Sequence, residues 1–308
     1  MSLKDFQQTT ALGPDALFLL EGATLDTSPG GQHRPKQIMI NALPLTKLPV
    51  AMRRMGWHTS AALMQRWFDS PGWQMPEDWK QVRTQPAPLS LPRAQCDDVI
   101  VKMSWATGFD RCRQAINLAE SRVTTPRAIS RLVELLEKAG WPKTGVFILG
   151  DTSLSAREMD ALPQINIADL GSTFDPLDDM YGALGMATVK VGVVGRTFSQ
   201  IDIVTKKKKN FFHIQHLGFY IRDHYDFNGM QFLGIWNDNR VLNQQEIPAL
   251  ITSDESKIFK IDEGPIALIT NGDFRAYRDK TGMGGDYIIY SDILWKQVDQ
   301  VVALDREN

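Results

Sequence analysis

The sequence predicts an α+β protein in which a helical region precedes a β-rich C-terminal region. Residues 1–48 are rich in Gly, Pro, Thr and Gln, segments between 49 and 138 have helical apolar spacing, and alternating β-branched segments begin near residue 180. We therefore expect three consecutive parts. They are a 1–95 N-terminal extension with a Trp-rich helical unit, a 96–178 α-rich middle, and a 179–308 antiparallel β-sheet or small β-barrel.

The first part is expected to be irregular up to residue 48, because 27–37 reads TSPGGQHRPKQ. A helix is then expected to begin with Thr59 or Ser60 as its cap and to end before Pro71. We interpret the nearby tryptophans as the core of a small helical unit, and an exposed docking face is the alternative. Those tryptophans are Trp57, Trp67, Trp73 and Trp79, and the helix would also bury Leu63, Met64 and Phe68.

The middle part contains the clearest helix signal. Thr125 is a capping residue, Pro126 suits the first helical position, and Gly140 ends the apolar pattern. A second helix is expected over 108–122, and a strand is expected over 97–105. The apolar face of the first helix would consist of Ile129, Leu132, Val133 and Leu136.

The C-terminal part is expected to contain a hairpin. Strands over 219–226 and 231–237 flank Asn228-Gly229, the pair typical of a tight turn with positive φ. In a regular strand Asp223 and Tyr225 share one face and Asp226 points the other way, unless a bulge redirects it. Further along, the glycines and charges of 271–286 predict a flexible hairpin loop, with an anion-binding loop as the alternative.

Composition limits the function classes. A net charge of -2 gives no general attraction to nucleic acid, and Cys96 and Cys112 are expected to be buried thiols. The run Lys206–Lys209 is typical of a solvated loop, with phosphate or lipid-headgroup contact as the alternative. No zinc, phosphate-loop or nucleophile-elbow pattern occurs. No signal peptide or apolar membrane span is apparent either, which predicts synthesis in the cytoplasm.

The stretch Asp223-His-Tyr-Asp-Phe-Asn228 is the candidate site. Two carboxylates that lie close together can hold Mg²⁺, or one can activate a water molecule, and a tyrosine hydroxyl can orient either. The alternative is that Asp and Asn side chains cap a turn through local hydrogen bonds.

This stretch resembles the activity domain of colicin M-type bacteriocins, which cleave the lipid II peptidoglycan precursor. The resemblance spans about 183–296 and includes LGMATVKVGVVG, HLGFYIRDHYDFN and GGDYIIYSDILW. It implies catalytic roles for Asp223, Tyr225 and Asp226, with Mg²⁺ on the two carboxylates. The family's His-Arg pair is replaced here by Phe232 and Leu233, which can neither transfer protons nor pair with phosphate. Candidate replacements and substrate-binding residues are Arg222, His224, Asn228 and Arg240, with His213 and His216 as further alternatives.

The N-terminal sequences PVAMRRMGWHTSAALMQRWF and VIVKMSWATGFDRC resemble an uncharacterised bacterial family linked to type VI secretion loci. This resemblance implies delivery to the periplasm of target cells, a secretion-apparatus partner and a cognate immunity protein. The leading hypothesis is therefore an antibacterial effector that cleaves a phosphoester of lipid II with Mg²⁺. The alternative is a non-enzymatic adaptor or structural protein of a secretion system.

Overall fold

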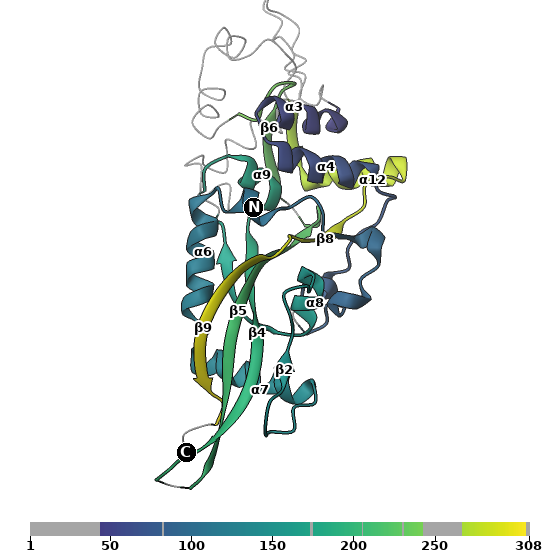
Figure 1. Cartoon of the computed structure of the whole chain (residues 1–308). Coiled ribbons are helices and arrows are strands. Elements are labelled where there is room, and N and C mark those ends of the chain that lie inside the picture. The colour runs from purple at the N-terminus through teal and green to yellow at the C-terminus, as the bar shows by residue number, and fades with distance from the viewer. Residues whose placement is uncertain are drawn as a thin grey trace, which may run out of the picture. The chain divides into compact units, whose positions relative to one another are not determined.

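The computed structural model describes residues 44–81, 83–172, 175–204, 206–229, 231–242 and 267–305. It confirms the α+β class (Figure 1). The chain forms two compact units, each assembled from three separate segments. The first unit contains Met1–Gln74, Ser172–Gly185 and Asp226–Asp286, and the second contains Met75–Gly171, Met186–Tyr225 and Tyr287–Asn308. The sequence suggested three consecutive parts, whereas these units interleave along the chain.

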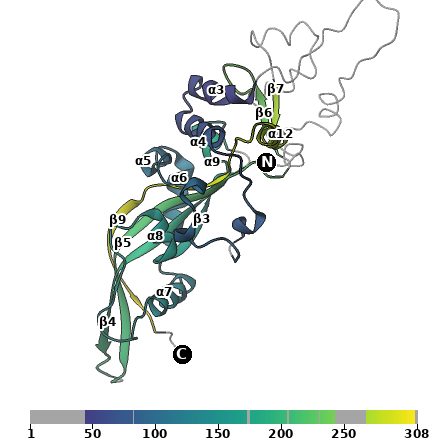
Figure 2. The same cartoon turned by 90° about the vertical axis from the view of Figure 1, so that its right-hand side faces the viewer.

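The second unit is built on a sheet whose centre is the long antiparallel pair β4 (Ala187–Ile201) and β5 (Lys208–Tyr225). The outer side of β4 pairs with β3 (Gln164–Leu170) and β2 (Ile148–Leu149). The outer side of β5 pairs with β8 (Tyr287–Tyr290) and β9 (Leu294–Ala303). The short β1 (Cys96–Asp97) joins β8 in parallel, so the sheet is mixed. Figure 2 shows how strongly β4, β5 and β9 curve.

Helices cover this sheet. They are α5 (Met103–Ala106), α6 (Asp110–Ser121), α7 (Pro126–Lys138) and α8 (Ala156–Ala161), with the 3-10 turns η2 (Glu77–Lys80), η3 (Pro88–Ser90) and η4 (Arg93–Gln95). The α7 prediction is confirmed, because the Thr125 side chain accepts a hydrogen bond from Ala128 N and Pro126 occupies the first turn. Its buried face includes Leu135, while Ile129 and Val133 are only half-buried. The predicted strand over 97–105 is wrong beyond Asp97, because Met103 begins a helix.

The first unit contains η1 (Leu45–Lys47), α3 (Leu48–Arg54), α4 (His58–Asp69), α9 (Asp179–Leu184) and α12 (Asn271–Thr281), with a two-stranded sheet of β6 (Phe232–Trp236) and β7 (Ala267–Thr270). Its core is aromatic. The Trp67 ring lies 5.0 Å from that of Phe227 and 5.2 Å from that of Phe274. Trp57 and Trp67 are buried, which confirms the core interpretation for these two, whereas Trp73 and Trp79 are half-buried.

The cap of α4 comes from a distant residue. The helix begins at His58, so Thr59 and Ser60 lie in its first turn and neither is the cap. Instead the Asp179 carboxylate accepts the backbone N–H groups of Thr59, at 3.1 Å, and Ser60, at 2.8 Å. A carboxylate at this position satisfies free N–H groups and complements the helix dipole.

Two predictions for the C-terminal part are wrong. Asn228-Gly229 does not join a hairpin, because β5 belongs to the large sheet while β6 pairs with β7. Gly229 has φ 72°, but Asn228 does not have the positive φ that the predicted turn requires. The stretch 271–281 is helix α12 and not a loop, and Thr270 and Asp273 form a capping box at its start. Of the extension expected to be irregular up to residue 48, residues 1–43 lie outside the described residues, while Leu45–Lys47 form the 3-10 turn η1.

Candidate functional site

The predicted site is divided between the two units. Arg222, Asp223, His224 and Tyr225 are the last four residues of β5 in the second unit, whereas Asp226 begins a segment of the first. The β8 partners of β5 define its two faces. Arg222 is paired with Tyr290 and bonds to its hydroxyl, while Tyr225 is paired with Tyr287 and stacks on its ring. Asp223 thus shares a face with Tyr225, as predicted, and Arg222 lies on the opposite face with His224.

The Tyr225 side chain is buried. Its ring centroid lies 5.1 Å from that of Tyr287, with 19° between the ring planes. Burial raises the pKa of the Tyr225 phenol, and the nearby charge of Asp223 raises it further. The phenol is therefore neutral at physiological pH. It can orient a neighbouring group through its hydroxyl, but it cannot serve as a phenolate nucleophile.

Asp226 takes part in a local turn. Its Oδ1 accepts the backbone N–H of Asn228 at 3.0 Å, the pattern of an Asx turn. The Asn228 carbonyl in turn accepts from Asn271 Nδ2 at 2.8 Å, and the Arg275 guanidinium donates to the carbonyl of Gly229. One oxygen of Asp226 thus has the turn-capping role that was the alternative interpretation.

Phe232 and Leu233, which the resemblance stated above aligns with the His-Arg pair of colicin M-type domains, lie in β6. Phe232 is 7% exposed and paired with Thr270, so it is part of the first unit's core. A charged side chain at this position would be buried within the sheet, which is costly without a partner. The fold around 232–233 thus accounts for an apolar pair there.

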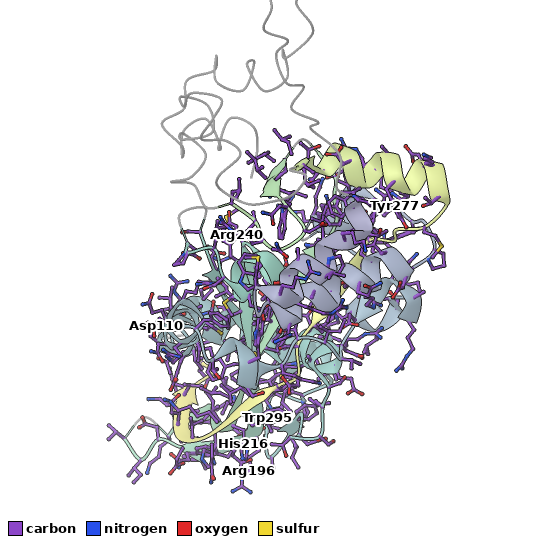
Figure 3. All side chains as sticks on the ribbon, turned by 90° about the horizontal axis from the view of Figure 1, so that it is seen from above. Asp110, Arg196, His216, Arg240, Tyr277 and Trp295 are labelled. Atoms are coloured by element: carbon purple, nitrogen blue, oxygen red, sulfur yellow. The ribbon has the colours of Figure 1, made fainter. Side chains whose placement is uncertain are left out.

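The remaining candidates belong to different parts of the chain. Figure 3 labels Arg240 in the first unit and shows His216 beside Trp295 in the second, with ring centroids 6.5 Å apart at 90°. The backbone N–H of Arg240 donates to Asn237 Oδ1, which closes the turn after β6. His213 Nε2 lies 2.6 Å from Asp299 Oδ1 in an exposed pair. Each of these residues has a local structural contact.

The chemistry of the donors is only partly compatible with Mg²⁺. Within the described ranges, no group of three or more His, Cys, Asp or Glu side chains could hold a metal ion. Mg²⁺ is often held by one or two carboxylates together with substrate phosphate oxygens and water, which is the arrangement Asp223 and Asp226 would need. Mg²⁺ therefore stays a prediction at these two residues.

A buried polar network lies in the second unit. Asp160, from α8, is its centre, and its Oδ1 accepts from Lys190 Nζ at 2.6 Å and from the Tyr220 hydroxyl at 2.8 Å. Asp160 Oδ2 accepts from the Tyr290 hydroxyl at 2.8 Å and lies 3.6 Å from Arg222 Nε. Arg222 Nε also donates to the Tyr290 hydroxyl at 3.1 Å. The side chains of Asp160, Lys190 and Arg222 are 5%, 13% and 8% exposed.

The network places two cations around one carboxylate. Burial lowers the pKa of Lys190, and the Asp160 charge partly offsets this effect. Burial, followed by the Asp160 charge, raises the pKa values of Tyr220 and Tyr290, so both phenols donate to Asp160 as neutral groups. The carboxylate fixes α8 over the sheet and holds the guanidinium of Arg222 against β8.

The comparisons with known proteins give one match. A model of a family of unknown function, DUF6402, matches residues 43–305. The chain belongs to the DUF6402 family. No curated protein and no solved structure matches it. In the described part of this DUF6402 chain, no helix combines the length and apolarity needed to cross a membrane.

Sequence reasoning identified Arg222 in this DUF6402 chain but missed Asp160, Lys190, Tyr220 and Tyr290. One signal was present, since Lys190 interrupts the valines of VKVGVV in a strand otherwise expected to be buried. A lysine there requires a partner, but Asp160 lies 30 residues away on a short helix, and no local pattern connects the two.

Proposed function

We propose that the protein is an antibacterial effector that acts on lipid II, the lipid-linked peptidoglycan precursor, by cleaving a phosphoester bond. The observation that carries the proposal is the sequence DHYDFN at the C-terminal end of β5, within a β region that resembles colicin M-type activity domains. The shared strand face of Asp223 and Tyr225 is consistent with a joint role for these two side chains.

In the proposed reaction Asp223 acts as general base. It takes a proton from a water molecule whose oxygen attacks phosphorus, the bond between phosphorus and the lipid oxygen breaks, and the released alkoxide takes a proton from solvent. The neutral Tyr225 hydroxyl orients the carboxylate or the water. The colicin M-type resemblance gives Asp226 a catalytic role as well, and Mg²⁺, when bound, would neutralise phosphate charge.

The proposed setting follows from the two resemblances. The protein would be made in the cytoplasm, delivered to the periplasm of a target cell by a secretion apparatus, and neutralised in the producing cell by a cognate immunity protein. Asn228, His224, Arg222 and Arg240 were the residues expected to bind substrate. Of these, Arg222 and His224 lie on the opposite strand face from Asp223, and Arg222 bonds to the Tyr290 hydroxyl, so we assign Arg222 a role in supporting the sheet.

A second candidate function is a non-enzymatic adaptor or structural protein of a secretion system. The observation that favours it is the burial of Phe232 in β6, because the charged pair of the colicin M-type family has no counterpart at 232–233. Under this alternative the β fold is retained while the reaction is lost.

Expression in a susceptible bacterium separates the two functions. If the protein is an effector, we expect lysis when the wild-type chain is targeted to the periplasm and no lysis when it stays in the cytoplasm. We also expect no lysis when Asp223→Asn is targeted to the periplasm. Asp279→Asn is the matched control, because Asp279 is exposed on α12. The adaptor predicts no lysis with any variant, together with one-to-one capture of a secretion spike or cargo protein. Equal lysis by the wild type and Asp223→Asn would contradict catalysis at Asp223.

A further inference from the structure

The hairpin that connects β4 and β5 extends beyond the rest of the large sheet. In the direction of the turn, the pairing between β5 and β9 ends at Phe211, whose partner is Ala303. The pairing between β4 and β2 ends at Arg196. Among the described residues, 199–201 and 208–210 therefore form strand pairs only with each other. In Figures 1 and 2 this hairpin projects past the end of β9.

The base of the hairpin is well ordered by side-chain contacts. Asn210 N donates to Asp305 Oδ2 at 2.5 Å, and Leu304 N donates to the Asn210 carbonyl at 2.9 Å. The Ser199 hydroxyl donates to Asn210 Oδ1 at 2.8 Å. At the turn, Asp202 N donates to Lys207 O and Lys206 N to Asp202 O, each at 2.9 Å. These two bonds connect the two sides of the turn at Asp202.

Three aliphatic side chains at the turn are exposed. Ile201 is 69% exposed, Ile203 is 83% exposed and Val204 is 89% exposed. Isolated exposed aliphatic residues are common, but three within four positions at the end of a projecting hairpin form a small apolar tip. Core packing does not require them, because they contribute little buried area.

Positive charge follows this apolar tip along the chain. Lys206, Lys207, Lys208 and Lys209 are all exposed, and Asp202 is the one carboxylate between 201 and 209. Lys209 Nζ lies 3.1 Å from Asp202 Oδ2, and Lys208 contacts the Thr144 hydroxyl. The whole chain has a net charge of -2, so the excess of positive charge is local to the hairpin.

We propose that this hairpin tip docks on the surface of an anionic lipid bilayer. Ile203 and Val204 would enter the boundary between headgroups and acyl chains, while the lysines would meet the lipid phosphates. Exposed apolar side chains next to a run of lysines suit such an interface, whereas a nucleic acid backbone gives aliphatic groups nothing apolar to contact. The inference does not rest on the proposed function, because the hairpin is expected to bind an anionic bilayer that contains no lipid II.

The electrostatic part has a predictable size. A lysine near an anionic bilayer contributes about fivefold to the partition coefficient. Replacing four lysines with glutamine is therefore expected to weaken binding by more than about 100-fold at low salt. The attraction is screened by added salt, so binding should also weaken when ionic strength rises.

The test is co-sedimentation of the full chain with large vesicles, made either of phosphatidylcholine alone or of phosphatidylcholine with about 30% phosphatidylglycerol, an anionic fraction that gives a strong negative surface potential. We expect the wild type to bind the anionic vesicles. This binding should be abolished when four substitutions are combined, namely Lys206→Gln, Lys207→Gln, Lys208→Gln and Lys209→Gln. The matched control replaces four exposed lysines elsewhere, Lys47, Lys102, Lys138 and Lys280, which gives the same net charge. This control should bind nearly as well as the wild type.

Insertion is measured separately with a polarity-sensitive fluorophore on Val204→Cys. The control is Ile148→Cys, at an exposed isoleucine on β2 that lies five residues from Ile201 in register, or about 17 Å along the strand. The label at 204 should shift to the blue with anionic vesicles and the label at 148 should not. Equal sedimentation with both vesicle types, equal loss in both lysine sets, or no shift at 204 would each overturn the proposal. The proposal would also be overturned if the variant with the four hairpin lysines replaced lost binding to duplex DNA but kept binding to vesicles.

Discussion

The aromatic rings of Tyr225 and Tyr287 stack with their centroids 5.1 Å apart and 19° between their planes. This contact fixes Tyr225, the third residue of the DHYDFN stretch, against the neighbouring strand, since the two residues are register partners. It also separates two contributions of Tyr225, because the ring stabilises the sheet and the hydroxyl is the part available for chemistry.

Tyr225→Phe tests that separation. The substitution keeps the stacked ring, so the free energy of unfolding should fall by no more than about 1.5 kcal/mol. Cleavage of lipid II should fall at least about tenfold if the hydroxyl orients the reacting group. Tyr287→Phe is the control and should leave cleavage unchanged. Urea unfolding and product release report the two effects, and unchanged cleavage by Tyr225→Phe would remove the hydroxyl from the mechanism.

Asp160→Ala should be strongly destabilising. The substitution leaves Lys190 and Arg222 buried with no carboxylate between them, and breaking a buried pair in this way costs about 3–5 kcal/mol. Asp110→Asn is the comparison, because the Asp110–Arg113 pair is exposed and such pairs contribute about 0.2–1 kcal/mol. Urea denaturation measures both, and similar midpoints for the two variants would show that the Asp160 network is energetically unimportant.

Stability should decrease at alkaline pH. The pKa values of Tyr220, Tyr225 and Tyr290 are raised above the usual value of 10.0, so the unfolded chain loses these protons first as pH rises above about 10. Each buried phenol then reduces the free energy of unfolding by up to about 1.4 kcal/mol per pH unit. The lowered pKa of Lys190 acts in the opposite direction, but it is one group against three.

The measurement is the urea midpoint at pH 8 and pH 11, recorded together with phenolate absorbance. We expect a lower midpoint at pH 11 and a phenolate signal that appears with unfolding. A midpoint that is the same at both values, or phenolate absorbance from these tyrosines in the folded protein, would contradict the assignment of buried neutral phenols.

Gly284 and Gly282 provide a matched pair in the first unit. Both have positive φ, at 99° and 67°, but a Cβ on Gly284 would overlap the Trp67 ring, whereas one on Gly282 would have no atom within 4 Å. Gly282→Ala should cost about 1–2 kcal/mol from backbone conformation alone. Gly284→Ala should cost about 1–3 kcal/mol more, because the ring must move within its aromatic core. Equal thermal midpoints would show that the Trp67 cluster accommodates the methyl group.

Local patterns predicted the elements whose cause is local. Helix α7 has its cap, its first-turn proline and its apolar face within 16 residues, and β4 is rich in β-branched residues. Helix α12 was missed because its glycine and its many charged side chains resemble a loop. Its start is set by the reciprocal bonds of Thr270 and Asp273.

The parts that could not be predicted depend on partners far apart in sequence. The Asn228-Gly229 turn looked like a hairpin, but the partner of β6 is β7, which begins at Ala267. The same applies to Asp160, whose partners Lys190, Arg222 and Tyr290 come from three strands. The face that Asp223 and Tyr225 share was predictable, because it follows from strand alternation alone.

The most direct measurement is the reaction of purified protein with lipid II, with Mg²⁺ present or removed by a chelator. The account predicts release of water-soluble pyrophosphoryl-disaccharide by the wild type and by Asp279→Asn, loss of that product on chelation, and a decrease of at least about 100-fold with Asp223→Asn. Lack of product from the wild type, or equal product from the wild type and Asp223→Asn, would contradict the account.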